Sequence, residues 1–292
     1  MNLPELAKAL GYLRGIKLQY LGTVQGGPQS LAALMSNQVD YGAAFNGAIA
    51  QMASTGAPIK AVLAYYGSSG PVNSALLVKK SSTLRSARDL IGKKVAVNTL
   101  GANAEAVLDT YLSKGGLTQA QIKKVTLVPL PGINEEAALR EGKVDAAYLF
   151  GSLEVSALQH GGLRRLVVDT DLVGPYNGGS IVMREDFLDS NPDLAKRFVA
   201  GMAKAVMFAA RHPVAQTRKL LQAWLIKQGR PEDAKALDLW TGTGIATSAG
   251  LLRSRDFNLW LSWLKSRGDV KGDSINASDI FTNTYNPYVR KG

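Results

Sequence analysis

The chain has 292 residues, enough for two domains with cores of their own. Hydrophobic residues make up 46% and charged residues 20%, a balance typical of globular rather than disordered proteins. The absence of cysteine excludes disulfides, thiolate catalysis and cysteine zinc sites, and is compatible with a reducing or an oxidising compartment. The formal net charge of +11 favours encounters with anions and acidic surfaces.

Helical and strand patterns alternate over the first part of the chain. The predicted elements there are a helix at 3–10, a strand at 17–24, a helix at 28–36, a strand at 39–45, a helix at 46–54, and strands at 59–66 and 74–78. They continue as a strand at 93–98, a helix at 104–114, a strand at 125–130, a helix ending at 141, and strands at 144–150 and 164–168. Such alternation predicts a parallel or mixed sheet.

The last third of the chain is predicted to be mostly helical after a returning strand at 181–184. Helices are expected at 191–211 and 213–228, from 231, and at 256–265. In the last of these, Phe257, Trp260, Leu261 and Leu264 recur at helical spacing. A stripe of this kind indicates a face packed against the core rather than a binding surface.

One stretch of sequence occurs twice, 105 positions apart. Residues 33–45 align without a gap on residues 138–150, so that Asp40 matches Asp145 and Phe45 matches Phe150. Asn37 and Gly142 fall at the same place as left-handed helix C-caps. Two copies of one α/β unit predict two similar lobes, and small ligands commonly bind in the cleft between lobes. The register gives the first lobe no counterpart of the strand at 93–98, so this lobe is expected to lack its first strand here.

Three loops combine a strand end, a glycine and a helix start: residues 25–29, 46–47 and 99–103. In α/β sheets the loops after strand C-termini face the ligand crevice. Helix N-termini there offer unpaired amides and a partial positive charge, which suit sulfonate, nitrate, phosphate or carboxylate. The alternative is that these glycines only form tight turns. Three such loops in a repeated chain favour an anion site.

Signals for catalysis, metal binding and nucleic-acid binding are weak. His160 and His212 have no second metal ligand at useful spacing, and we expect both at the surface or at helix ends. There is no Walker loop and no Gly-x-Ser-x-Gly motif. Basic residues occur as dispersed pairs without interleaved aromatics, which indicates solvated charge and no nucleic-acid partner. The carboxylates of Glu135 and Glu136 are interpreted as structural, in the first turn of a helix.

Several phrases resemble a known family. They include Val39-Asp-Tyr-Gly, the segment from Gly56 to Val62 (Gly-Ala-Pro-Ile-Lys-Ala-Val), and the segment from Ala87 to Asn98, which contains Asp-Leu-Ile-Gly-Lys-Lys-Val-Ala-Val. The chain resembles the solute-binding proteins of ABC importers for sulfonates, nitrate and taurine. That group includes the thiamine-pyrimidine (NMT1/THI5-like) binding proteins.

The resemblance implies a type II periplasmic-binding-protein fold, an α/β architecture with two similar lobes around a ligand cleft and a helical C-terminal part. Lobe 1 would combine residues 1–91 with 180–292, and lobe 2 would be 92–179. It further implies a non-enzymatic, monomeric protein without cofactor or metal, which captures a small anionic ligand and passes it to an ABC permease and its ATPase. A periplasmic location follows, although the residues from Met1 onward do not read as a signal peptide.

The predicted ligand site draws on loops of both lobes. Its residues are Gly26, Gly27, Asn46, Gly47, Thr99, Gly101, Asn103, Phe150 and Gly151, with Tyr65, Tyr66 and Asn134 at the rim. A bulky residue at position 27 is expected to abolish binding and to leave the fold intact. Two alternatives remain open: an enzyme of the same fold acting on a pyrimidine-like substrate, and a ligand-sensing module. The fungal pyrimidine synthases related to the family use cysteines, which this chain lacks.

Overall fold

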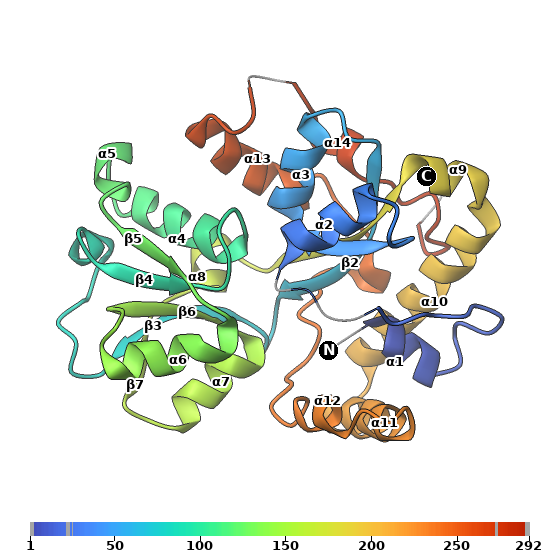
Figure 1. Cartoon of the computed structure of the whole chain (residues 1–292), viewed down its shortest axis with the longest axis horizontal. Coiled ribbons are helices and arrows are strands. Elements are labelled where there is room, and N and C mark those ends of the chain that lie inside the picture. Colours follow the sequence, from blue (N-terminus) through green and yellow to red (C-terminus); the bar gives the residue numbers. More distant parts are fainter. Residues whose placement is uncertain (1–2, 22–23, 25, 272–273, 290–292) are drawn as a thin grey trace. The chain divides into compact units, whose positions relative to one another are not determined.

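The computed structural model describes residues 3–21, 24, 26–271 and 274–289, which fold into two compact units (Figure 1). Unit 1 takes the described residues up to Gly67 and from Tyr176, and unit 2 takes residues 68–175. The first division falls earlier than the predicted boundary at 91–92, because strand β3 (Ser74–Lys79) pairs inside the sheet of unit 2. The helical residues after 185 belong to unit 1 and form no third unit.

Unit 2 is built on a five-stranded mixed sheet of order β5-β4-β6-β3-β7. β4 is parallel to β5 and β6, whereas β3 is antiparallel to β6 and β7. The other strands are β4 (Lys94–Val97), β5 (Thr126–Pro129), β6 (Ala146–Phe150) and β7 (Leu163–Val168). The helices are η1 (Ala87–Leu90), α4 (Asn103–Lys114), α5 (Gln119–Ile122), α6 (Gly132–Glu141), α7 (Gly151–Gln159) and α8 (Asp169–Val173). In Figure 1, α6 and α7 lie on one face of this sheet and α4 on the other.

Unit 1 contains a three-stranded sheet of order β1-β8-β2, with β1 antiparallel to β8. Its strands are β1 (Gly42–Phe45), β2 (Ile59–Ser68) and β8 (Tyr176–Arg184). Its helices before β8 are α1 (Leu3–Ala9), α2 (Gly27–Met35) and α3 (Asn46–Ser54). Those after β8 are α9 (Glu185–Ser190), α10 (Pro192–Arg211), α11 (Val214–Lys227), α12 (Pro231–Lys235), η2 (Ser248–Gly250), α13 (Arg255–Arg267) and α14 (Ala277–Ile280).

The internal repeat of the sequence is a repeat of structure. Helices α3 and α7 coincide residue for residue at an offset of 105, and α2 and α6 begin at the same offset. Asn37 and Gly142 both end their helices with positive φ, at 60° and 76°. β1, β8 and β2 of unit 1 correspond in order to β6, β3 and β7 of unit 2. The predicted pair of similar α/β units is therefore confirmed.

The predicted strand at 17–24 is wrong for the residues that the structure describes. Residues 17–21 and 24 form no strand, and 22–23 lie outside the described residues. In unit 2 the matching strand β5 pairs with β4 alone. The described part of unit 1 has no strand in the position of β4, so no neighbouring strand is available there for a β-ladder. Tyr20 and Leu21 are consequently more than half exposed.

Helix α2 covers the edge of β1 that β4 would occupy in unit 2. The Ser30 hydroxyl accepts a hydrogen bond from the Ala43 amide at 3.0 Å. A Cβ atom on Gly27 would lie 2.9 Å from the Cβ atom of Ala44, so only glycine lets the helix come this close. A side chain and a closely packed helix thus replace a strand at this edge.

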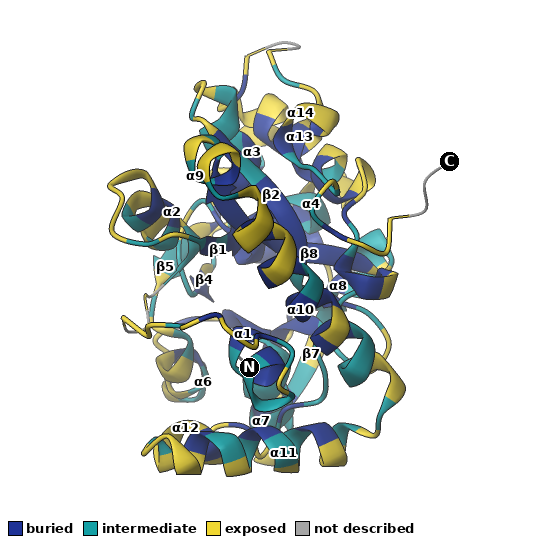
Figure 2. Ribbon diagram, turned by 90° about the vertical axis from the view of Figure 1, so that its right-hand side faces the viewer, coloured by how far each residue is buried: buried dark blue, intermediate teal, exposed yellow. Residues whose placement is uncertain are grey.

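Strand β8 is longer than the predicted strand at 181–184 because it starts at Tyr176. Every residue of β8 is buried, as the dark blue strand in Figure 2 shows. The sequence Asn177-Gly178-Gly179 is typical of a turn, but in the structure these residues lie within β8 and a ring packs on both glycines. The ring of Tyr66 lies where side chains on Gly178 and Gly179 would be.

The core of unit 1 joins its sheet to the C-terminal helices. Residues of α1, α10 and α11 pack with Val62 of β2 and with Ile181 and Met183 of β8. The aromatic stripe of α13 is buried as predicted: Phe257 and Trp260 are fully inaccessible. Trp260 meets Phe45 edge-on with ring centroids 4.8 Å apart. Burial of such rings supplies much of the free energy that holds helices to a sheet.

We predict that Ser30→Ala lowers the free energy of unfolding of unit 1 by about 1 kcal/mol, because the Ala43 amide loses its acceptor. The four tryptophans lie at positions 224, 240, 260 and 263, all in unit 1. Urea unfolding followed by tryptophan fluorescence therefore reports on this unit. Ser36→Ala is the matched control, since the Ser36 hydroxyl is exposed. Equal stability of the two variants would contradict the proposed role of Ser30.

Candidate functional site

Three helices of unit 2 begin at one edge of its sheet. α4, α6 and α7 follow the C-terminal ends of β4, β5 and β6, which run parallel. Their N-cap residues are Ala102, Pro131 and Phe150, and none of them caps the helix with its side chain. Amides in these first turns therefore have no N-cap acceptor, and the helix dipoles add partial positive charge. We name this edge the loop edge of unit 2.

The loop between β4 and α4 carries three of the predicted site residues. Thr99 is half-buried, and Asn103 is buried as the first residue of α4. Gly101 has φ of +69° with open space at its Cβ position. Its amide is already engaged, because it donates to Glu105 Oε2 at 2.7 Å. A carboxylate of the chain itself thus occupies part of the predicted anion-binding loop.

The loops before α6 and α7 hold the other predicted residues of unit 2. Asn134 is exposed in the first turn of α6, and its amide donates to the Pro131 carbonyl at 2.7 Å. Phe150 is half-buried, with its ring 5.1 Å from that of Tyr148. The Gly151 amide donates to the Asn73 carbonyl at 3.2 Å, and its Cβ position is open. The structure therefore brings these residues to the loop edge of unit 2.

In unit 1, Gly26 and Gly27 start α2 beside the end of β1. Gly26 is the N-cap, in extended conformation. A Cβ on Gly27 would lie 3.2 Å from the Phe45 amide nitrogen, so α2 and α3 start close together. The expectation that Gly27→Leu leaves the fold intact is wrong, since a larger side chain would push α2 away from β1.

Asn46 is predicted from the sequence to contact ligand, but its side chain is used inside unit 1. It is fully buried, and its Nδ2 donates to the carbonyls of Asn177 and Asp256 at 3.0 and 3.3 Å. Its Oδ1 accepts from the Ser180 hydroxyl at 2.6 Å. The adjacent Gly47 lies against the Phe45 ring, 2.5 Å from where its Cβ would be. These contacts connect α3, β8 and the start of α13.

The same polar network continues through Asn177 and Asp256. Asn177 Nδ2 donates to Asp256 Oδ2 at 2.9 Å and to Thr247 Oγ1 at 3.0 Å. Burial raises the pKa of Asp256, although the hydrogen bond from Asn177 acts in the opposite direction. Every group in this cluster has a partner, so it fixes the backbone at the start of α3 rather than offering a free side chain.

Tyr65 and Tyr66 lie in β2 with ring centroids 6.2 Å apart and nearly perpendicular. Burial raises the pKa of both phenols, so both stay neutral at physiological pH. Tyr65 packs against the core of unit 1, and Tyr66 packs against Gly178 and Gly179. Packing accounts for both tyrosines in this structure.

Glu135 lies in the first turn of a helix, as predicted, but its carboxyl group is buried rather than solvated. Glu135 is fully buried in the first turn of α6, and neither carboxyl oxygen has a hydrogen-bond partner among the described residues. Burial alone raises its pKa to about 8. No sequence pattern distinguishes it from the adjacent Glu136, because the two differ only in which face of the helix they occupy. Asn98, at the same loop edge, also has a buried oxygen without a donor among the described residues.

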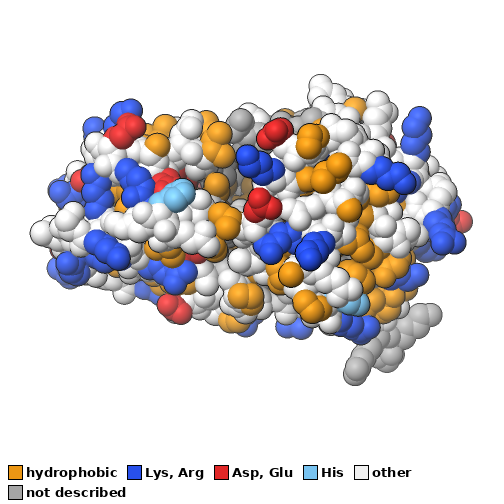
Figure 3. Space-filling model, turned by 90° about the horizontal axis from the view of Figure 1, so that it is seen from below, with side chains coloured by type: hydrophobic (Ala, Val, Ile, Leu, Met, Phe, Trp, Pro, Cys, Tyr) orange, Lys and Arg blue, Asp and Glu red, His pale blue; other side chains and the backbone are white. Residues whose placement is uncertain are grey.

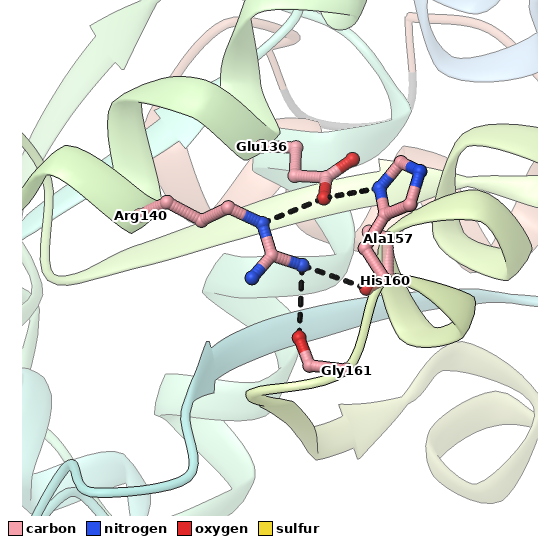
Figure 4. Close-up of polar contacts among 5 residues, drawn as sticks. All are labelled: Glu136, Arg140, Ala157, His160 and Gly161. Atoms are coloured by element: carbon pink, nitrogen blue, oxygen red, sulfur yellow. Dashed lines mark hydrogen bonds and ion pairs between the residues drawn. The ribbon is translucent and has the colours of Figure 1, made fainter.

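Glu136, unlike Glu135, has hydrogen-bond partners for its carboxylate (Figure 4). It accepts from Arg140 Nε at 2.7 Å and contacts His160 Nδ1 at 2.8 Å. Burial opposes ionisation, but the hydrogen bonds from His160 and Arg140 prevail and lower the pKa of Glu136. His160 is an exposed helix-end residue, as predicted, and the cluster joins α6 to the end of α7.

The charges on the face drawn in Figure 3 are dispersed. Figure 3 shows lysine and arginine side chains scattered over one face among apolar and uncharged ones. Within the described residues, no cluster of three or more acidic, histidine or cysteine side chains suits a metal ion. Among the same residues, no helix combines the length and the apolar character needed to span a membrane.

A sequence model of the NMT1/THI5-like family matches residues 6–216, more than two thirds of the chain. The chain belongs to the NMT1/THI5-like family. A curated relative is an Escherichia coli (strain K12) protein named for the binding of aliphatic sulfonates. It is 33% identical over 148 residues, which cover 50% of this chain and 44% of that protein. The matched segment thus spans less than half the length of this relative.

Solved structures show the fold of this NMT1/THI5-like protein to be that of periplasmic binding proteins. The nitrate-binding protein NrtA from Synechocystis PCC 6803 matches with a TM-score of 0.76 at 12% identity, covering 97% of this chain and 84% of that one. The alkanesulfonate-binding protein SsuA from Xanthomonas axonopodis pv. citri, bound to MOPS, matches with a TM-score of 0.70 at 20% identity, covering 96% and 94%. The predicted fold class is confirmed.

We predict that Asn46→Ala destabilises unit 1 of this NMT1/THI5-like protein by about 3 kcal/mol, because it leaves buried polar groups of β8 and α13 without a partner. Tryptophan fluorescence during urea unfolding measures the change. Asn134→Ala, at an exposed asparagine of the same predicted site, should leave stability unchanged. An Asn46→Ala protein with wild-type stability but no ligand binding would instead support Asn46 as a ligand contact.

Proposed function

We propose that the chain is the extracytoplasmic solute-binding component of an ABC importer and that it captures a small anionic solute such as a sulfonate or nitrate. The observation that carries this proposal is the family match over residues 6–216. The sulfonate-binding and nitrate-binding proteins of similar fold support it. The chain would hold its ligand without turnover and deliver it to a permease coupled to an ATPase.

The loop edge of unit 2 is the part of the chain that best suits an anion. Three helices start there without side-chain N-caps, and each helix end favours an anion by about 0.3–1 kcal/mol when exposed and up to about 2 kcal/mol when partly buried. We propose that the ligand contacts Thr99, Asn103, Asn134, Phe150 and Gly151. We further propose that Gly26, Gly27 and Gly47 contribute backbone rather than side-chain contacts.

The alternative with the same fold is an enzyme. The desulfurization enzyme DSZB matches with a TM-score of 0.61 at 16% identity, covering 97% of this chain and 94% of that one. A match at this identity concerns the fold alone, so it assigns no reaction to this chain. The lack of cysteine excludes a thiol nucleophile here.

A ligand screen tests the proposal directly. Purified protein is titrated calorimetrically with ethanesulfonate, taurine, nitrate, acetate, a pyrimidine and, as a cationic control, spermidine. We expect at least one anion to bind with a micromolar Kd, roughly −8 kcal/mol, and to be recovered unchanged by mass spectrometry. At 100 times Kd the bound ligand should stabilise the protein by about 2.7 kcal/mol. Binding of spermidine alone, or conversion of a bound compound to product, would refute the proposal.

A further inference from the structure

Glu135 is a buried carboxyl group that the fold does not need. The matching residue of unit 1 is Ser30, which serves as acceptor for the Ala43 amide at the edge of β1. In unit 2 the corresponding edge of β6 instead pairs with β4, at Ala146 and Ala147. Both oxygens of Glu135 are left without a partner among the described residues. A buried polar group of this kind weakens the fold, and such groups cluster at functional sites.

The position of Glu135 places it next to the loop edge of unit 2. It lies in the first turn of α6, a helix of 10 residues whose N-cap offers no side-chain acceptor. Helical side chains lean toward the N-terminus of their helix, here the end at the loop edge. Asn98, which follows β4 at that edge, has a buried side-chain oxygen that also lacks a donor among the described residues. Glu135 and Asn98 therefore both have buried side-chain oxygens without a hydrogen-bond partner among the described residues, at the edge where an anion is proposed to bind.

No charged neighbour fixes the charge state of Glu135 within the described part of the chain. Helix α6 packs against β3, β4, β6 and α7. Lys79 ends β3 and Lys94 starts β4. Both therefore lie at the ends of the strands opposite to the loop edge. The remaining charged groups of α6 and α7 are engaged with one another or with nearby residues: Glu136, Arg140, Glu141, Glu154 and His160. Tyr148 of β6 is a phenol rather than a charged group. Burial is the sole cause of the shift in the pKa of Glu135 to about 8.

We propose that Glu135 is a positioning residue that makes anion binding at the loop edge of unit 2 depend on a proton. This inference rests on the proposed function. With Glu135 neutral, the start of α6 presents its partial positive charge, equivalent to roughly half a charge, to the ligand. Ionised Glu135 places a full negative charge in that first turn, which cancels the helix field and repels the anion. The anion therefore binds the form of the protein in which Glu135 carries its proton.

The expected pH dependence has a definite sign. Below pH 7 the carboxyl group is neutral and affinity is constant. Above pH 8 the binding-competent fraction decreases tenfold per unit, so Kd for ethanesulfonate should be about tenfold higher at pH 9 than at pH 7. Without ligand, the raised pKa means that the folded state holds its proton longer than the unfolded state. The carboxyl group should therefore lower stability progressively from about pH 4.5 to pH 8.

Calorimetric titration with ethanesulfonate at pH 6, 7, 8 and 9 tests the inference in wild type, Glu135→Gln and Glu136→Gln. Wild type and Glu136→Gln should show the tenfold increase in Kd, because Glu136 is paired and stays ionised throughout. In Glu135→Gln the ratio of Kd at pH 9 to that at pH 7 should be near one. Repeating the pH 8.5 titration in triethanolamine and in Tris, two amine buffers with different ionisation enthalpies, should show proton uptake on binding only when Glu135 is present.

The outcomes separate this inference from the function on which it rests. If ethanesulfonate, taurine, nitrate and acetate all fail to bind the three proteins at pH 6, the proposed function is refuted; if only ethanesulfonate fails, nitrate replaces it in the titrations. Binding with the same Kd from pH 6 to 9 in wild type would refute the role of Glu135 alone. A Glu135→Gln protein that keeps the wild-type pH profile would also refute that role. If Glu135→Gln does not fold, Glu135→Met replaces it, since an apolar side chain of similar size also removes the ionisable group.

Discussion

Each unit depends on one strand that enters its sheet from a distant part of the chain. In unit 2, β3 lies between β6 and β7 and is antiparallel to both. In unit 1, β8 takes the same place between β1 and β2. Neither sheet is continuous without this strand, because its neighbours have no contact with each other. In unit 1 the insertion makes the unit discontinuous in sequence.

The two units differ in what lies beside the other edge of β1 and of β6. Unit 2 adds β4 and β5, and β4 satisfies the backbone of β6. Unit 1 covers the corresponding edge of β1 with α2, and the Ser30 hydroxyl replaces one strand hydrogen bond. The starts of α2 and α3 are consequently packed tightly on β1, and Asn46 is fixed by a buried network. Open glycine positions with positive φ, Gly101 and Gly151, occur instead at the loop edge of unit 2.

Sequence patterns predict the elements and the repeat, but not what each site residue does. Periodicity locates α10, α13 and most strands because their apolar spacing reflects burial. It places a strand at 17–24, since local alternation carries no information on whether a partner strand exists. The loop pattern predicts Asn46 as a ligand contact, and the position of Glu135 in a first helical turn is explained by the helix dipole. Both assignments require knowing which way a side chain points, and that depends on packing between segments more than 100 residues apart in sequence.

We propose that a small anion binds the chain through loops that follow the strand ends. Hydrogen–deuterium exchange with and without saturating ethanesulfonate at pH 6.5 tests it most directly. If these loops hold the anion, exchange of the amides at 99–104, 132–135 and 151–153 becomes slower, together with that at 26–29 and 46–48, and exchange in α11 and α12 changes little. Ligand-induced protection confined to other segments, with these five loops unchanged, would show that the anion binds elsewhere.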